Sequence, residues 1–310
     1  MIMTKKKILN IILNVVILVV MMDIGVRLGM NWYIRHHDIP GDYGKIEYMF
    51  KHVDAQIILM GSSICMNSIN PEILEKNLGK KVFNGGINGQ QLEFFDVMTE
   101  AVLNHSHPEL MILVLRHNDL TAQGYGRLEM MNIYYNLGNA KLDSYLVGGK
   151  IKQKVLLNSA LYKFNTYWWR ILLYHFKSFD ELAHGGFVGK PVPSILPQCI
   201  DNGADKIIPP VNHHKQQCLA NILTACRKAG TRLWIVIPPE FYKRSNETDF
   251  SGLSYIQRFC DENNIPFIND LQHPDYIDHP EYFYDNDHLN VNGAEIYTQR
   301  ILGILQKEGK

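Results

Sequence analysis

Two segments far apart in the chain carry side chains that could together perform nucleophilic catalysis. Ser63 follows Gly61 and Ser62 directly after a short apolar run, and a serine on such a tight turn can expose both its hydroxyl and its backbone N–H. Near the other end, Asp285 and His288 stand three residues apart. In a turn, the carboxylate can therefore reach the imidazole Nδ1 and leave Nε2 free to accept a proton. The pattern predicts a nucleophile, a general base and a carboxylate that orients the base.

The C-terminal segment also has two simpler interpretations. Asp285 and Asp287 could cap the helix expected to follow, with His288 merely polar. The same three side chains could ligate a metal, but no second His/Asp cluster at ligand spacing accompanies them. We therefore expect neither a metal nor a cofactor.

The scaffold for these residues is visible as an alternation of apolar runs and helical patterns. Short apolar runs that read as strands lie at residues 56–60, 81–83, 110–115, 231–237 and 266–268, and helical spacing appears at 71–78, 91–103, 213–229, 251–263 and 292–306. This alternation predicts an α/β fold with a doubly wound, flavodoxin-like parallel sheet of five strands. Ligands bind outside the carboxyl ends of such strands, so the first candidates are Ser63, the loop around Asn88 and Gly89, and the segment 116–119.

The N-terminus indicates where the protein works. Lys5, Lys6 and Lys7 precede an apolar run over residues 8–22, which continues more weakly to Met30. Residues 8–30 form a helix long enough to approach the ~30 Å of a bilayer core. Asp23 and Arg27 are four apart and could neutralise each other at the far interface. We favour an uncleaved anchor over residues 1–30; a cleaved signal peptide and a buried soluble helix are the alternatives.

The lysine cluster before the run favours an N-terminus on the inside, which would place the rest of the chain on the extracytoplasmic side. Residues 31–54 are polar and aromatic and read as a juxtamembrane connector, and residues 55–310 as one catalytic domain. Within it, residues 120–210 are rich in Tyr and Trp and interrupt the alternation as a helical insertion. This insertion is either a subdomain packed on the sheet, or a cap over the substrate or a surface lying on the membrane.

Composition excludes some functions. Lys plus Arg and Asp plus Glu both number 31, so the chain has no net positive charge to hold a polyanion, and we expect no nucleic-acid partner. The five cysteines form no CxxC pair, which predicts no obligatory disulfide framework.

Taken together, these segments resemble the SGNH hydrolase superfamily of GDSL-like esterases, lipases and acyltransferases. The turn at 61–63 resembles its first block, which implies Ser63 as nucleophile. The stretch 84–89 is similar to the second block, which implies Gly89 as a backbone oxyanion donor. Residues 117–119 resemble the third block, which implies the Asn118 side chain as another donor beside the Ser63 N–H. The pair Asp285 and His288 matches the fourth block.

The sequence departs from that family pattern in two places. Ser62 stands where the family has Asp, and Arg116 stands where the third block has Gly. Arg116 and its neighbour His117 are candidate substrate-binding residues. The Ser-for-Asp exchange looks like the variant in anchored envelope members.

The resemblance implies a serine esterase that acts on an acylated carbohydrate or another ester, and a cell-envelope glycan is one candidate substrate. An O-acyltransferase that modifies a surface polysaccharide could use the same site. A non-catalytic envelope assembly or binding protein is the alternative from another functional class.

Overall fold

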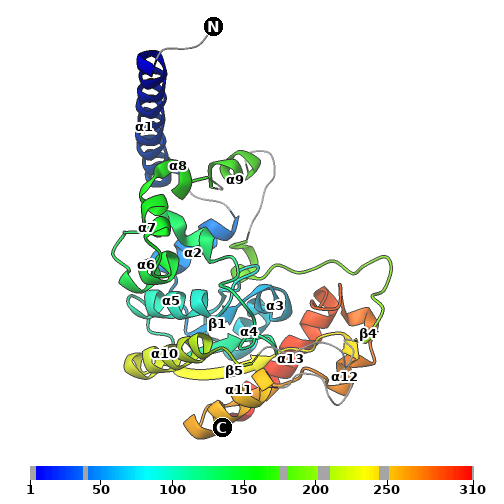
Figure 1. Cartoon of the computed structure of the whole chain (residues 1–310). Coiled ribbons are helices and arrows are strands. Elements are labelled where there is room, and N and C mark those ends of the chain that lie inside the picture. Colours follow the sequence, from blue (N-terminus) through cyan, green and yellow to red (C-terminus); the bar gives the residue numbers. More distant parts are fainter. Residues whose placement is uncertain are drawn as a thin grey trace. The chain divides into compact units, whose positions relative to one another are not determined.

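The computed structural model describes residues 5–37, 41–165, 167–174, 181–201, 210–243 and 251–308 (Figure 1). Its contacts divide the chain into two compact units. The first, here called the helical unit, comprises Met1–Pro40 and Glu129–Phe179. The second, the sheet unit, comprises Gly41–Leu128 and Asp180–Lys310.

The sheet unit is built on five parallel strands, which confirms the predicted α/β class. They are β1 (Ile57–Gly61), β2 (Val82–Asn84), β3 (Leu110–Val114), β5 (Arg232–Ile237) and β7 (Phe267–Asn269). Their order across the sheet is β2-β1-β3-β5-β7, and every neighbouring pair runs parallel. A small second sheet pairs β4 (Ile200–Asp201) with β6 (Tyr242–Lys243), which the sequence did not indicate.

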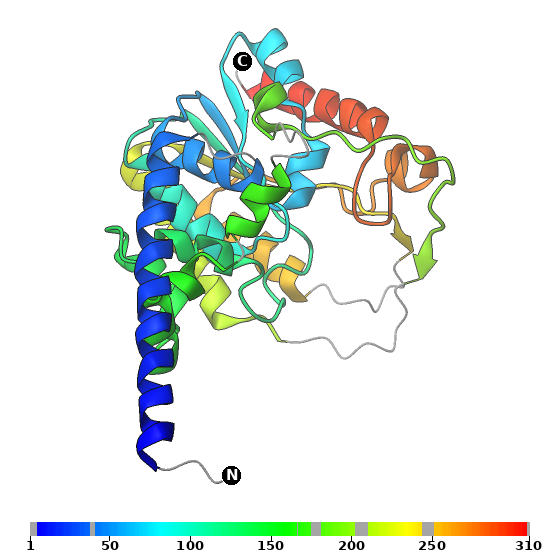
Figure 2. The same cartoon turned by 90° about the horizontal axis from the view of Figure 1, so that it is seen from above.

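Helices cover both faces of the five-stranded sheet, and Figure 2 gives a second view of them. On one face, Leu59 and Ile112 belong to a core completed by α3 (Ser63–Ser68), α4 (Pro71–Leu78) and α13 (Val291–Glu308). On the other face, the Met111 sulfur contacts the Thr99 hydroxyl of α5 (Leu92–Leu103) and the Cys226 thiol of α10 (His213–Ala229). Strands buried on both faces explain why they appear as continuous apolar runs rather than alternating ones.

The predicted helices of this unit agree with the observed ones within a few residues. In addition to those named above, the unit contains α11 (Ser251–Asn263), α12 (Pro274–Ile277), η2 (Ala183–Gly186) and η3 (Pro280–Tyr282). Helix α4 shows why the local signals worked. The Asn70 side chain accepts a hydrogen bond from the N–H of Glu72, Pro71 fills the first turn, and Gly79 ends the helix at a φ of 65°.

The expected connector at residues 31–54 is instead largely helical. Helix α1 (Lys5–His36) continues through its first part, and α2 (Gly41–Lys51) belongs to the sheet unit. Tyr43, Ile46 and Met49 of α2 are buried, which polar composition alone did not indicate. Helix α2 packs against α5.

The helical unit combines α1 with most of the predicted insertion. Its other elements are α6 (Ala140–Val147), α7 (Ile151–Asn158), α8 (Ala160–Lys163) and α9 (Tyr167–Tyr174), preceded by η1 (Leu128–Tyr134). Of the expected insertion 120–210, residues 129–179 belong to this unit, residues 120–128 and 181–201 belong to the sheet unit, and residues 202–209 lie outside the described part. Helix α1 is the one described helix long and apolar enough to cross a membrane, with a mean hydropathy of 2.4 in its most apolar window and no buried residue.

Candidate active site

The turn that carries Ser63 follows β1 directly. Ser62 has extended backbone angles and Ser63 opens α3. Gly61 is required at the end of the strand, since a Cβ there would lie 2.5 Å from the Val114 carbonyl oxygen and 2.6 Å from the Cys65 Cβ. The close packing of β1, β3 and α3 therefore leaves no room for a side chain at residue 61, and Ser63 lies at the carboxyl edge of the sheet.

Ser63 and His288 meet across the 225 residues that separate them. The distance between Ser63 Oγ and His288 Nε2 is 2.9 Å. His288 Nδ1 lies 2.9 Å and 3.0 Å from the two carboxylate oxygens of Asp285. With the ring proton on Nδ1, the imidazole donates to Asp285 and accepts from the Ser63 hydroxyl, which is the arrangement a general base needs.

Asp285 is held in its ionised form. Partial burial favours protonation, but the hydrogen bond and charge of His288 and the N–H of Asp287 outweigh it, so the pKa of Asp285 lies below its usual value. Its Oδ1 accepts the backbone N–H of Asp287 at 2.9 Å and that of His288 at 2.8 Å. The carboxylate thus organises the turn as well as the imidazole.

The alternative in which Asp285 and Asp287 cap the last helix does not hold. The cap of α13 is Asn290, whose side-chain oxygen accepts from the N–H of Asn292 at 3.0 Å and of Gly293 at 3.1 Å. The Asn290 amide also donates to the Glu281 carbonyl at 2.7 Å.

Ser62 and Cys65 flank Ser63 but are enclosed. Ser62 is 5% exposed and Cys65 is fully buried. Burial raises the pKa of the Cys65 thiol to about 12, so it stays protonated and packs beneath the turn. Ser63 is only partly buried, so it is the most accessible of the three residues. All five cysteines are free thiols, and Cys199 alone among them is exposed.

The loops that carry Gly89 and Asn118 follow β2 and β3, the strands on either side of β1. The first loop is tied to β1, because the N–H of Gly85 donates to Leu59 and that of Ile87 donates to Gly61. Gly89 is exposed with a φ of 68°, a region that favours glycine. Both loops therefore flank the Ser63 turn.

The Asn118 side chain is available for a ligand. Its backbone carbonyl accepts the N–H groups of Thr121 and Ala122, which closes a turn after β3. The residue is exposed, and its side-chain amide makes no hydrogen bond within the described part of the chain. A donor in this state can bind an oxyanion without first giving up a protein partner.

Arg116 and His117, the two predicted substrate-binding residues, are committed to carboxylates. The Arg116 guanidinium lies 2.6 Å from Asp287 and 4.0 Å from Glu240. Burial opposes its charge, yet Glu240, Asp287 and Asp119 keep the pKa of Arg116 above its usual value. His117 is buried and lies 3.1 Å from Glu240. Arg116 thus links the Asn118 turn to the segment that carries His288.

Glu240 and Asp287 were not assigned to the site from the sequence. Asp287 accepts from Arg116 and, at 3.0 Å, from the Tyr242 hydroxyl. Glu240 is 1% exposed and directly follows β5 and two prolines. The sequence did contain a signal for Glu240. Like Ser63, it follows the carboxyl end of a predicted parallel strand, where ligands bind in such sheets.

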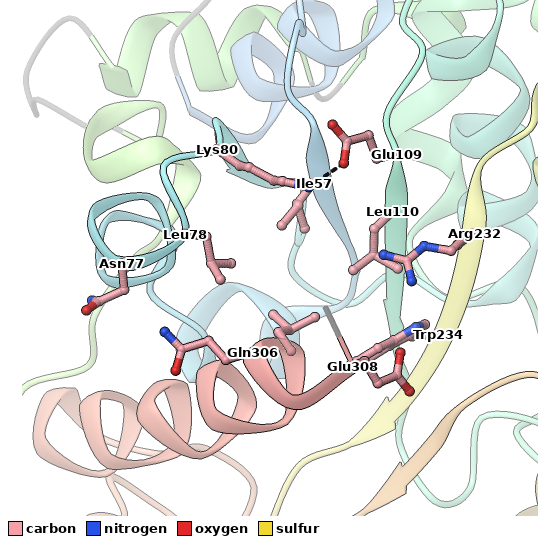
Figure 3. A pocket seen from close by; sticks show the side chains of 11 residues that line it. Ile57, Asn77, Leu78, Lys80, Glu109, Leu110, Arg232, Trp234, Gln306 and Glu308 are labelled. Carbon is pink, nitrogen blue, oxygen red and sulfur yellow. Dashed lines mark hydrogen bonds and ion pairs between the residues drawn. The ribbon is translucent and has the colours of Figure 1, made fainter. Parts of the chain in front are cut away.

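Two further features lie outside this site. Glu93, His214 and Cys218 place donor atoms within 4.8 Å of one another. However, the Lys215 ammonium already lies 3.0 Å from the Glu93 carboxylate, which disfavours a cation there. A cavity of about 520 Å³ opens at the amino ends of the strands, lined by Ile57, Leu110 and Arg232 among others (Figure 3). It lies at the edge of the sheet opposite Ser63.

No family model and no curated protein matches the sequence. Among solved structures, the chain is similar to one described as an acylhydrolase from Bacteroides fragilis, at 11% identity and a TM-score of 0.45, over 86% of this chain and 97% of that one. It is similar to a GDSL-like lipase from Bacteroides thetaiotaomicron, at 14% identity and a TM-score of 0.43, over 86% and 100%. It is also similar to a family two carbohydrate esterase from Clostridium thermocellum in complex with cellohexaose, at 8% identity and a TM-score of 0.42, over 83% and 65%.

Proposed function

We propose that this chain is a membrane-anchored serine esterase that cleaves acyl esters through an acyl-enzyme on Ser63. The observation that carries the proposal is the continuous hydrogen-bonded chain of Ser63, His288 and Asp285, with 2.9 Å at each of its two links. A serine hydroxyl is a weak nucleophile by itself, and an imidazole at this distance, oriented by a carboxylate, activates it.

In the proposed reaction, Ser63 Oγ attacks the ester carbonyl carbon while His288 Nε2 takes its proton. The tetrahedral intermediate then collapses, the bond between the carbonyl carbon and the alcohol oxygen breaks, and His288 returns the proton to the leaving alcohol. A water molecule, deprotonated by the same imidazole, attacks the acyl-enzyme and releases the acid and free Ser63. Asp285 stabilises the imidazolium in both steps without becoming protonated.

The oxyanion would be bound by the backbone N–H of Ser63 and Gly89 and by the Asn118 amide. The N–H of Ser63, as the first residue of α3, has no acceptor within its own helix. Gly89 and Asn118 follow the strands that flank β1, so donors can converge from three neighbouring loops. Losing one such donor typically costs ~10²- to 10³-fold in rate.

Helix α1 supports the proposed location and substrate class. Lys5, Lys6 and Lys7 precede its apolar residues, which supports an anchor with an inside N-terminus and a catalytic unit on the extracytoplasmic side. A site confined there would meet acylated molecules of the cell envelope, and an acylated glycan is the substrate we propose. The anchor confines the enzyme to that surface.

The test compares two neighbouring serines. Ser63→Ala should abolish release of acetate from acetylated polysaccharide by the purified full chain, with an unchanged unfolding midpoint. Ser62→Ala, the matched control, should keep most of the activity, because Ser62 is buried and His288 pairs with Ser63. Equal activity in the two variants would refute the proposal.

Two other outcomes identify the alternatives. If acetyl groups appear on an added glycan acceptor rather than as free acetate, the same acyl-enzyme serves a transferase. If folded protein releases no acyl group and takes up no serine-directed reagent, the chain is a non-catalytic envelope protein.

A further inference from the structure

Helix α1 makes specific contacts with the other helices of the helical unit. Helix α8 packs against α1. Asp23 of α1 accepts hydrogen bonds from the Ser159 hydroxyl at 2.6 Å and from the N–H of Leu161 at 3.0 Å. Arg27 lies 3.2 Å from Asp23 and donates to the Asn158 carbonyl at 2.5 Å. Asp23 and Arg27 thus find their partners at the junction of α7 and α8.

This contact limits the depth to which α1 can enter a bilayer. The residues before Asp23 that are free of charge, 8–22, extend ~22 Å as a helix, which is less than the ~30 Å of a hydrocarbon core. A span this short draws its flanking residues toward the lipid interface. The start of α8, which holds Asp23, must therefore lie at that interface if α1 crosses the membrane.

Helix α9 follows closely and exposes large aromatic side chains. It begins four residues after Lys163, the end of α8, a distance of at most ~14 Å along the chain. The N–H of Trp168 donates to the Phe164 carbonyl at 3.3 Å, which fixes the junction. Trp168, Trp169 and Leu173 are 50%, 52% and 52% exposed, whereas Tyr167 is buried. Tryptophan is enriched at membrane interfaces, where its ring meets apolar chains and its N–H meets water.

The charge of this region fits a lipid surface better than a second copy of the chain. Residues 129–179 hold seven Lys and Arg against two Asp and Glu, in a chain whose net charge is zero. Lys150, Lys152 and Lys154 around α7 are exposed. Such a segment attracts anionic headgroups, whereas two like-charged copies would repel each other.

We propose that α9 is a second membrane contact, in which Trp168, Trp169 and Leu173 insert into the interfacial layer beside the anchor. The chain would then contact the bilayer through two elements, α1 and α9. This inference rests on the proposed anchor and is independent of the proposed chemistry.

The test measures tryptophan quenching in the full chain reconstituted into vesicles that contain anionic lipid, with and without lipids brominated near the headgroup. All proteins carry Trp32→Phe, because Trp32 of α1 is also exposed. Trp234, buried in the sheet unit, remains as an unquenched internal reference. The protein with Trp168 and Trp169 should be quenched by the brominated lipids. In a Trp168→Phe/Trp169→Phe double variant, most of that quenching should be lost.

Equal quenching in the two proteins would overturn the inference. The fluorescence of Trp168 and Trp169 could instead be unchanged by brominated lipid while its emission maximum shifts with the protein-to-lipid ratio. That result would indicate that the α9 face contacts a second copy of the chain, and it would also overturn the inference. If alkaline buffer released the chain from the vesicles, α1 would not be a membrane anchor. The second membrane contact, which depends on that anchor, would then be refuted as well. None of these results depends on esterase activity, so failure here is distinct from failure of the proposed chemistry.

Discussion

Substitution of Asp285 can separate two roles of its carboxylate, the hydrogen bonds to the backbone and the orientation of His288. Its Oδ1 accepts two backbone N–H groups, from Asp287 and His288, and both oxygens lie within 3.0 Å of His288 Nδ1. Asp285→Asn keeps an oxygen for the backbone but offers an amide N–H to the imidazole. That donor favours the ring tautomer with its proton on Nε2, which cannot accept from Ser63. Asp285→Ala removes both roles.

The magnitudes follow from exposure and from the role of the base. The Asp285 side chain is 45% exposed, so water can replace its backbone bonds, and Asp285→Ala should cost only about 1 kcal/mol of stability. Asp285→Asn should be nearly neutral for folding. Both should lower kcat by ~10²- to 10⁴-fold, since either change leaves His288 without its orienting anion.

The assay pairs kcat on an acetyl ester with thermal unfolding across pH. Because the folded pKa of Asp285 lies below its usual value, its contribution to stability is full at neutral pH and is lost as the pH falls through that pKa. The small difference in unfolding midpoint between wild type and Asp285→Ala should therefore shrink in acid. An Asp285→Asn variant with wild-type kcat would show that Asp285 does not orient His288 for catalysis.

Three other changes probe the surrounding loops. Asn118→Ala should lower kcat by ~10²-fold with an unchanged unfolding midpoint, because its side chain is exposed; full activity would remove it from the oxyanion site. Gly89→Ala should cost ~1–2 kcal/mol of unfolding free energy, since its φ is 68°, and should lower kcat as well; unchanged stability and rate would contradict this. Burial lowers the pKa of Lys45, bonded to two buried carbonyls, to about 8. The free energy of unfolding, measured with denaturant and compared with that of Lys45→Met, should therefore rise by up to ~3 kcal/mol in the wild type between pH 8 and 10.5. A rise toward lower pH would contradict the lowered pKa of Lys45.

Much of the sheet unit could be predicted because its signals are local. Strands buried on both faces are continuous apolar runs, and α4 and α10 have Asn caps and glycine ends that can be read directly. The order of the four segments that resemble the family's blocks was enough to predict that Ser63 and His288 lie at the same edge of the sheet.

Other features depend on tertiary contacts that a local pattern does not specify. The apolar residues of α2 have helical spacing, but that spacing does not identify α5 as the helix on which they pack. The role of Asp23 depends on Ser159, which is 136 residues away. Arg116 was expected to meet substrate, but its partner Asp287 comes from a segment that folding brings to it. In each case the partner is distant in sequence, so composition and periodicity could not identify it.

The proposed esterase activity requires that His288 makes Ser63 a reactive nucleophile. The most direct measurement is the intact mass of folded protein after treatment with a fluorophosphonate, with the modified residue located by peptide mapping. We predict one adduct on Ser63 in the wild type and in Ser62→Ala, and none in Ser63→Ala or His288→Ala. An adduct on Ser62, or equal labelling of Ser63 without His288, would show that Ser63 is not a nucleophile activated by His288.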